Sequence, residues 1–448
     1  MSAEQADTLW CELAWLGGEQ AEAAVLVELD GERIASVTSG VESPPPDATR
    51  LPGLTIPGMA NAHSHAFQRA LRGRTQSGRG DFWTWRSRMY ELAGRIDPDL
   101  YLALARATFG EMALAGITAV GEFHYLHHGP GGTRYEDPNA LGAAVIAAAG
   151  EAGIRITLLD TCYLQGGIGK EAEGAQLRFS DGSAEAWAER VDGIQAGDGA
   201  RVGAAIHSVR AVDPDAAAQV AAIAAERSWP LHAHVSEQPA ENEECVSSYG
   251  MTPTGVLAEA GALSSAFTAV HATHLADGDV ELLGGGRCGV CLCPTTERDL
   301  ADGVGPARRL AEAGARLSLG TDSQALIDMF EEARATELDE RLETGMRGGH
   351  SAAGLLRSAT AEGCAAIGWP EAGEIAAQGL ADLVTVGLDG VRLAGTSADH
   401  ALESLVFAAS AADVREVIAG GRFIVRDGAH VEIDVASELN EAISRLSA

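Results

Sequence analysis

The chain has 448 residues, of which 64 are acidic and 32 basic, so its formal net charge is −32 with histidine counted as neutral. Such an acidic protein lacks the positive field that neutralises phosphates, which argues against nucleic acid or an anionic membrane surface as a partner and favours a small molecule. Hydrophobic residues make up 46% of the chain, enough to bury a large core, and this excludes a disordered protein.

The chain carries no pattern typical of export or membrane insertion. Its first twenty residues contain Glu4, Asp7, Glu12 and Glu19 and no basic stretch, so neither a secretory signal nor a transit peptide is expected. The longest apolar run, residues 140–150, is far shorter than the ~20 residues that a membrane span requires. We therefore expect a cytoplasmic protein whose cysteines are reduced.

Strand-like runs occur near both ends of the chain. Within residues 23–40, two such runs flank Asp30-Gly31, a dipeptide that strongly predicts a hairpin. Toward the C-terminus, short β-branched runs predict strands at 381–388, 391–393, 414–418 and 422–425. Because chain termini often lie close together, we expect residues 1–56 and 371–448 to form one composite β-sandwich domain.

The middle of the chain, residues 57–370, alternates apolar strands with alanine-rich helical stretches such as 100–115 and 214–226. This alternation over about 310 residues predicts a (β/α)8 barrel of the TIM type. The eight expected strands are 54–57, 117–123, 154–159, 202–206, 230–234, 267–271, 289–293 and 315–320. The alternative is an open doubly wound sheet, but the glycine clusters at 129–132 and 284–286 do not fit its phosphate-binding turn and are expected to be plain turns.

Residues able to bind a metal lie at the predicted C-terminal ends of these strands, where barrels of this type build their active sites. His63 and His65 follow the first strand, His232 and His234 end the fifth with Glu237 three residues on, His271 ends the sixth and Asp322 follows the eighth. Histidines with one carboxylate and a position left for water are typical of a catalytic metal site. Each element alone has an ordinary explanation, such as core histidines or an Asp322 that caps a helix, but together they predict a metal site.

Two arginines form a second group of candidates. Arg86 lies between the first two strands and Arg210 follows the fourth, where they could bind carboxylates in a bidentate manner. Their alternative role is in surface ion pairs, which is the more common role of an arginine in so acidic a chain. Gln68 and Tyr125 could donate further hydrogen bonds from the same rim.

Two other clusters are expected to be structural. His124, His127 and His128 resemble a further metal site, but we interpret them as loop packing or substrate-side hydrogen bonding. Cys291 and Cys293 are expected to be buried thiols on one face of a strand.

Eight segments together resemble the amidohydrolase superfamily and, within it, the formimidoylglutamate deiminases of histidine degradation. The generic segments contain His-x-His and the aspartate of the eighth strand, whereas Phe-Gln-Arg, Trp-Arg, His-Tyr and His-Ser-Val-Arg are more specific to these deiminases. The segments are 57–70, 82–86, 122–128, 207–211, 232–238, 271–274, 293–297 and 320–323.

The resemblance implies a zinc-dependent hydrolase that converts N-formimino-L-glutamate to N-formyl-L-glutamate and ammonia, and it suggests a homodimer. It implies one Zn2+ per subunit, held by His63, His65, His234 and Asp322. It also implies Glu237, His271 and Asp322 as catalytic residues and Gln68, Arg86, Tyr125, His207 and Arg210 as substrate-binding residues. Two separate arginines fit a dicarboxylate substrate.

A single metal is expected because the only lysine, Lys170, follows the third strand, whereas two-metal relatives often use a modified lysine at the end of the fourth. Ser236 departs from the small apolar residue expected before the catalytic glutamate. The alternatives are a deaminase that acts on a purine, pterin or triazine ring, and a metal-free barrel used as a scaffold. An aspartate analogue is also open, since one methylene changes binding by only ~1 to 3 kcal/mol.

Overall fold

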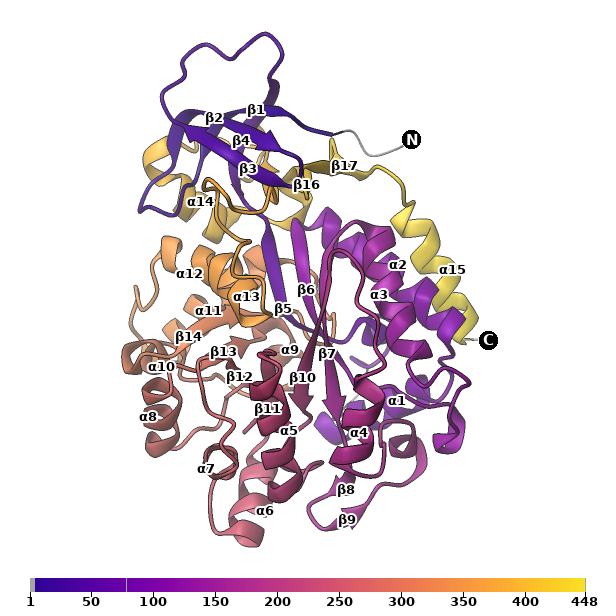
Figure 1. The fold of residues 1–448 in the computed structure, drawn as a ribbon. Coiled ribbons are helices and arrows are strands. Elements are labelled where there is room, and N and C mark those ends of the chain that lie inside the picture. Colours follow the sequence, from indigo (N-terminus) through magenta and orange to yellow (C-terminus); the bar gives the residue numbers. More distant parts are fainter. Residues whose placement is uncertain (1–4, 78, 448) are drawn as a thin grey trace.

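The computed structural model describes residues 5–77 and 79–447, which form a barrel with a smaller β-domain at one end (Figure 1). Eight parallel strands make up the barrel in chain order, which confirms the predicted (β/α)8 architecture. They are β5 (Met59–Ser64), β6 (Ile117–His124), β7 (Arg155–Cys162), β10 (Ala200–Ile206), β11 (Leu231–Val235), β12 (Phe267–His271), β13 (Gly289–Leu292) and β14 (Arg316–Leu319). A bridge between Ser64 and Asp322 joins the last strand to the first.

The first predicted barrel strand, 54–57, is wrong. It is the end of β4 (Thr49–Pro57), which pairs with β1 and β15 in the terminal domain, and the barrel begins only at β5. Both segments are apolar, so hydrophobic pattern alone cannot separate them. Gly58 makes the short link possible, because a Cβ there would lie 2.1 Å from Thr118 Oγ1.

The terminal domain combines strands from both ends of the chain in the order β18-β17-β16-β15-β4-β1-β2-β3. They are β1 (Thr8–Ala14), β2 (Glu22–Asp30), β3 (Arg33–Thr38), β4, β15 (Leu383–Val386), β16 (Val414–Ala419), β17 (Arg422–Arg426) and β18 (Ala429–His430). The β2–β3 pair confirms the hairpin predicted at Asp30-Gly31. The strand predicted at 391–393 is wrong: these residues form a turn, in which Val391 is 98% exposed.

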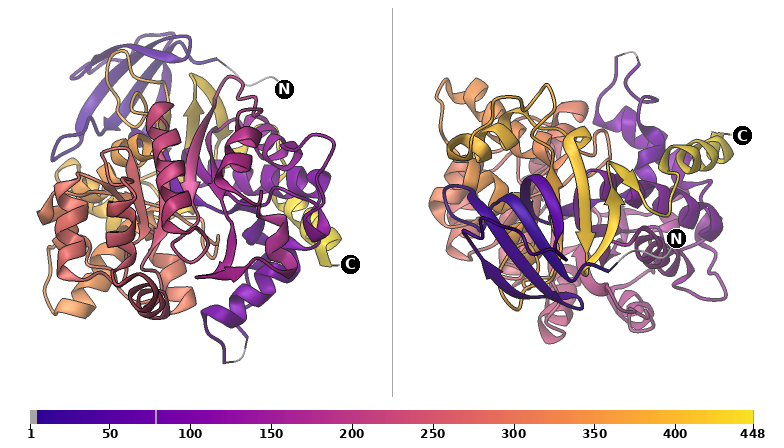
Figure 2. Two further views of the ribbon diagram at one scale, coloured as in Figure 1. Left: turned by 60° about the horizontal axis from the view of Figure 1, so that its bottom comes forward. Right: turned by 90° about the horizontal axis from the view of Figure 1, so that it is seen from above.

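The sheet of this domain is folded over, so that its N-terminal and C-terminal strands share one core. Leu9, Val25 and Ile34 pack in one buried cluster with Leu383 and Phe423. Seen from above, the strands from the two ends lie side by side across the barrel (Figure 2).

The β-domain is joined to the barrel where the barrel strands begin. Gly58 N donates to Asp382 O at 2.8 Å, just before β5. The buried guanidinium of Arg155 on β7 donates two hydrogen bonds to the Asp382 carboxylate, at 2.9 and 3.2 Å. The domain therefore leaves the opposite end of the barrel, where the strands finish, open to ligands.

Helices surround the barrel. They are α1 (Phe82–Ala93), α2 (Pro98–Leu114), α3 (Ala140–Ala152), α4 (Ala184–Val191), α5 (Pro214–Glu226), α6 (Pro239–Tyr249), α7 (Pro253–Glu259), α8 (Asp277–Gly285), α9 (Pro294–Leu300), α10 (Ala307–Ala313), α11 (Met329–Thr344), α12 (Ala352–Ala359) and α13 (Ala361–Ala366). Two more belong to the C-terminal segment, α14 (Ala401–Ala408) and α15 (Val435–Ser447). Short 3-10 turns are η1 (Ala66–Leu71), η2 (Pro130–Gly132), η3 (Gly174–Arg178), η4 (Ala398–His400) and η5 (Ala411–Asp413).

Local sequence explains where several helices begin. Asp97 and Asp213 cap α2 and α5, each followed by a proline at the first helical position, which confirms the helices predicted there. Of the glycine clusters, 129–132 is a turn as expected. Gly284 instead lies inside α8, where a Cβ would lie 2.3 Å from Ala313 O of α10, so glycine permits close helix packing.

Among the described residues, no helix is both long and apolar enough to cross a membrane. All seven cysteines are buried and unpaired, including Cys291 and Cys293 as predicted. Cys288 and Cys291 have C-x-x-C spacing, but both thiols are buried and free.

Candidate active site

A cavity of about 140 Å³ opens at the ends of the barrel strands. Its lining contains every predicted metal-binding, catalytic and substrate-binding side chain except His63, which is fully buried. The lining residues from that set are His65, Gln68, Arg86, Tyr125, His207, Arg210, His234, Glu237, His271 and Asp322. The fold therefore gathers residues that lie more than 250 positions apart in the sequence, as Gln68 and Asp322 do.

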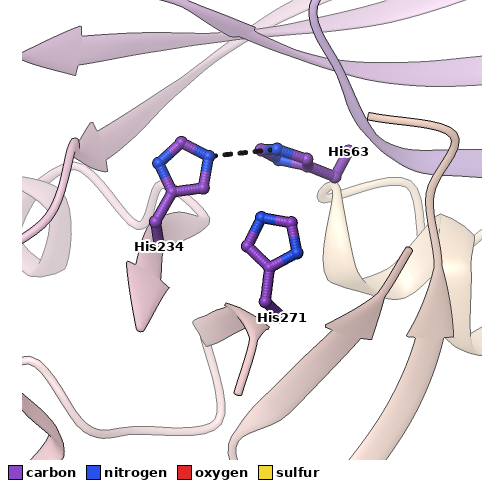
Figure 3. Close-up of side chains that lie close together, drawn as sticks. All are labelled: His63, His234 and His271. Atoms are coloured by element: carbon purple, nitrogen blue, oxygen red, sulfur yellow. Dashed lines mark hydrogen bonds between the residues drawn. The ribbon is translucent and has the colours of Figure 1, made fainter. Parts of the chain in front are cut away.

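The candidate metal ligands converge on one point. Asp322 Oδ1 lies 3.3 Å from both His63 Nε2 and His65 Nε2, and His234 Nε2 lies 3.2 Å from His63 Nε2. The rings of His63, His234 and His271 face one another from three different strands (Figure 3).

These side chains fit a zinc ion. Backbone carbonyls hold two of the rings from behind: Phe123 O lies 2.9 Å from His65 Nδ1, and His207 O lies 2.9 Å from His234 Nδ1. Such contacts fix the ring and direct Nε2 toward a metal. Burial lowers the pKa of His63 and His234 well below its usual value and that of His65 to about 3, which favours the neutral, metal-binding form.

Glu237 and His271 lie beside this cluster. His271 Nε2 is 3.9 Å from both Glu237 Oε1 and Asp322 Oδ2, and its Nδ1 is 3.4 Å from Glu297 Oε1. Burial by itself would lower the pKa of His271, but the hydrogen bond to Glu297 and the neighbouring carboxylates outweigh it and raise this pKa to about 10. The surrounding carboxylates therefore favour the protonated form of His271, whose Nε2 faces Glu237 and Asp322.

The two predicted arginines differ in their contacts. Arg210 is buried and paired, with its Nη2 at 2.9 Å from Glu237 Oε2 and its Nε at 3.6 Å from Glu241 Oε2. Arg86 is half-buried and lies 4.5 Å from the ring centre of Trp83, but no carboxylate among the described residues forms an ion pair with it. Arg86 is thus a cation on the cavity wall that forms no ion pair with a described carboxylate.

Gln68, Tyr125 and His207 complete the predicted set. Gln68 Nε2 donates to Tyr125 Oη at 2.9 Å, and both side chains are buried. His207 is half-buried, with its ring 4.6 Å from that of Tyr163 at a steep angle. Tyr163 and Phe179 add an aromatic wall that the sequence analysis did not single out.

Three buried glutamates contact residues of the site, and none of them was predicted as a site residue from the sequence. Glu297 contacts His271, Glu241 contacts Arg210, and Glu122 accepts hydrogen bonds from Ser64 Oγ and Ala66 N at 2.6 and 2.7 Å. Burial raises the pKa of Glu122 to about 8. A charged residue inside the apolar run of β6 was a signal that could have identified Glu122.

The second histidine cluster is bonded to backbone and carboxylate groups of its surroundings. His127 Nε2 contacts Thr161 O at 2.9 Å, and His128 Nε2 lies 3.0 Å from Asp181 Oδ1. His124, His127 and Asp160 are close enough to share a cation, but Arg190 Nη2 already occupies Asp160 at 2.7 Å. The positive charge of Arg190 opposes a second metal there.

A small hairpin lies at the mouth of the cavity. Its strands are β8 (Gln165–Gly167) and β9 (Lys170–Glu171), and they line the cavity together with α6. Lys170 Nζ donates to Glu244 Oε1 of α6 at 2.9 Å.

Comparison with known proteins agrees with this geometry. The sequence model of the amidohydrolase family matches residues 54–424. The chain belongs to this family. A crystal structure of an amidohydrolase from Brucella melitensis superposes with a TM-score of 0.89 at 31% identity, and the match covers 99% of this chain and 100% of that one.

Two further proteins are similar to this amidohydrolase, one in sequence and one in fold. Formimidoylglutamate deiminase of Pseudomonas aeruginosa is 37% identical over 400 residues, which cover 86% of this chain and 87% of the relative. An adenosine deaminase from Xanthomonas campestris, solved with bound zinc, shares the fold with a TM-score of 0.85 at 22% identity over 99% of each chain.

Proposed function

We propose that this amidohydrolase is a zinc-dependent deiminase that hydrolyses N-formimino-L-glutamate to N-formyl-L-glutamate and ammonia in histidine degradation. The observation that carries the substrate class is Arg86, a guanidinium on the cavity wall with no carboxylate partner among the described residues. A substrate carboxylate would supply that partner in bidentate geometry. The 37% identity to the Pseudomonas aeruginosa formimidoylglutamate deiminase supports the same reaction.

In this proposal His63, His65, His234 and Asp322 hold one zinc ion. When bound, zinc supplies Lewis acidity that lets water react as a nucleophile at neutral pH.

The remaining steps belong to side chains of the cavity. As the water oxygen bonds to the amidine carbon, Asp322 accepts a proton from it and Glu237 gives a proton to the amidine nitrogen. The hydroxyl proton then passes to the same nitrogen, the carbon–nitrogen bond breaks as the new C=O bond forms, and ammonia leaves. The proton held by Asp322 restores Glu237. General acid–base groups of this kind each contribute ~10² to 10⁴-fold. His271, held by Glu297 at 3.4 Å, donates a hydrogen bond that orients the reacting groups.

The substrate's two carboxylates would contact different arginines. Arg86 binds one carboxylate from the aromatic wall, and Arg210 binds the other while its Nη2 keeps Glu237 oriented at 2.9 Å. Gln68, Tyr125 and His207 add hydrogen bonds near the reacting end.

A ring deaminase is the second candidate, and the aromatic lining of the cavity favours it. Trp83, Tyr125, Tyr163 and Phe179 all line the cavity and could stack on a purine. An unpaired arginine, however, has no role toward a neutral ring.

Ammonia release from the purified, zinc-loaded protein separates the two candidates. N-formimino-L-glutamate is compared with N-formimino-L-aspartate, guanine and adenosine, and a sample stripped of metal with a chelator is the control. Rapid release from the glutamate derivative alone would support the proposal. Release from a purine and not from the glutamate derivative would overturn it in favour of a ring deaminase.

The expected homodimer and cytoplasmic location stay predictions. Sedimentation equilibrium of the full chain tests the first, with a single species of twice the chain mass as the expected result.

A further inference from the structure

The seam of the barrel, where β5 meets the residues that follow β14, also contains candidate metal ligands. Among the described residues, β5 and the segment that follows β14 meet through one bridge, in which Asp322 N donates to His63 O and His65 N donates to Asp322 O, both at 3.0 Å. Gly320 allows this close approach, because a Cβ there would lie 2.8 Å from His63 O and His63 Cβ. The relative position of His63, His65 and Asp322 thus depends on how this seam is held.

A buried network of hydrogen-bonded polar side chains stabilises the seam. Gln324 Nε2 donates to Ser64 Oγ at 2.9 Å and to Asp322 O at 2.8 Å, and its Oε1 accepts from Thr321 Oγ1 at 2.6 Å. Thr321 is in turn held by Asn61 of β5, whose Oδ1 accepts from Thr321 N at 2.9 Å. Gln324, Ser64, Thr321 and Asn61 are all fully buried.

The same hydrogen-bond network extends to β6. Ser64 Oγ accepts from Gln324 and donates to Glu122 Oε2 of β6 at 2.6 Å. The second oxygen of Glu122 accepts from Ala66 N at 2.7 Å, just after His65. The His63–His65 turn is therefore held from one side by Gln324 and from the other by Glu122.

Backbone strain shows that the seam needs such support. Asp322 and Gln324 have φ angles of +44° and +60°, in the left-handed region that ordinary side chains avoid. Residues held in sparsely populated regions of this kind cost about 1 to 3 kcal/mol each and persist only where the surroundings over-determine them. The hydrogen bonds of Gln324 to Ser64, Thr321 and Asp322 O are the contacts that fix this turn.

We infer that Gln324 and Ser64 are positioning residues that set the Asp322 carboxylate at the correct distance from His63 Nε2 and His65 Nε2, and so determine how tightly the metal is bound. Neither side chain is one of the candidate ligands. The inference rests on the proposed metal site but not on the proposed substrate. Outer contacts that orient metal ligands typically change metal affinity about 10- to 100-fold when removed.

The test measures zinc affinity without any substrate. Zn2+ is titrated into the metal-free full chain in competition with a chromophoric chelator, for the wild type, Gln324→Met and Ser64→Ala. Gln324→Met keeps the side-chain length but loses all three hydrogen bonds, and Ser64→Ala is small enough to fold if the first variant does not. We expect zinc binding about 10- to 100-fold weaker in each, and an altered visible spectrum when Co2+ replaces zinc.

Two further variants make the result specific. In the double variant Gln324→Met/Ser64→Ala, the loss of zinc affinity should be smaller than the product of the two single losses, since the two residues share one hydrogen bond. The matched control is Asn139→Leu, which removes a buried amide paired with Arg190 away from the metal ligands; it should lower thermal stability and change zinc affinity less than twofold.

Three outcomes would overturn the inference. Wild-type zinc affinity in both Gln324→Met and Ser64→Ala would show that neither residue positions Asp322. Equal weakening by Asn139→Leu would show a general loss of stability instead. If the wild type binds no zinc, the metal site itself is wrong, and this result is distinct from a failure of the substrate assignment, which only the ammonia assay reports.

Discussion

Replacement of Arg86 by methionine tests the substrate class most directly. The guanidinium has cation–π contacts with Trp83 and Tyr90, at 4.5 and 5.5 Å from their ring centres, and no ion pair with a described carboxylate. Methionine keeps an apolar side chain against both rings, so the change removes mainly the charge. Because Arg86 forms no ion pair with a described carboxylate, the loss of its charge should weaken substrate binding and leave folding unchanged.

The magnitude follows from the half-buried position of this side chain. Loss of one partner from a hydrogen-bonded charge pair costs about 2 to 5 kcal/mol in a buried interface, and partial exposure places Arg86 at the lower end. A cost of about 2 to 3 kcal/mol corresponds to a decrease in kcat/KM of roughly 30- to 150-fold. Most of this decrease should be a rise in KM, with zinc content unchanged.

The assay is ammonia release, with Arg88→Met as the matched control. Arg88 lies on the same helix but is 64% exposed and pairs with Glu91, so its loss removes the same charge and should change kcat/KM less than twofold. Two monocarboxylate analogues complete the test, N-formimino-4-aminobutyrate and N-formimino-L-norvaline. With one of them Arg86→Met should perform as well as the wild type, because the carboxylate that Arg86 binds is absent. An equal decrease with all three substrates, or an effect no larger than that of Arg88→Met, would refute a role in carboxylate recognition.

Three other predictions follow from contacts described above. Glu237→Gln should lower kcat by about 10² to 10⁴-fold while bound zinc, measured by elemental analysis, stays at the wild-type level; unchanged kcat would remove this residue from proton transfer. Arg210→Met should lower stability by about 3 to 5 kcal/mol because it leaves Glu237 and Glu241 buried without their cation, and adding Glu241→Gln should recover part of the loss in denaturant titrations; no recovery would contradict this account. Asp382→Ala should destabilise the protein by a similar amount because Arg155 loses its bidentate partner between the two domains, and a thermal midpoint equal to the wild type would argue against that role.

Much of the barrel and the candidate metal ligands could be predicted from the sequence, because both depend on the order of the strands along the chain. Parallel strands in chain order bring their C-terminal ends to one face, so His63, His234 and Asp322 had to meet once the strands were recognised. The error at residues 54–57 has the same origin, since an apolar run predicts a strand but not the sheet to which it belongs.

Contacts between distant side chains were beyond sequence reasoning. Nothing in the pattern distinguishes Arg210, which pairs with Glu237, from Arg86, which has no carboxylate partner among the described residues. Gln324 and Glu122 were missed because their importance comes from one shared neighbour, Ser64, that lies far from both in the sequence. Spacing predicts which residues share a barrel face but not which of them form hydrogen bonds there.

Lys170 gives this protein an unusual experimental property. It is the only lysine in the chain, and it is 68% exposed at the mouth of the cavity, where it pairs with Glu244. An amine-reactive dye can therefore attach to only one side chain, on the hairpin that borders the entrance. Fluorescence from a dye at that position would report ligand entry in real time without any engineered cysteine, and would follow binding of molecules that the enzyme does not convert.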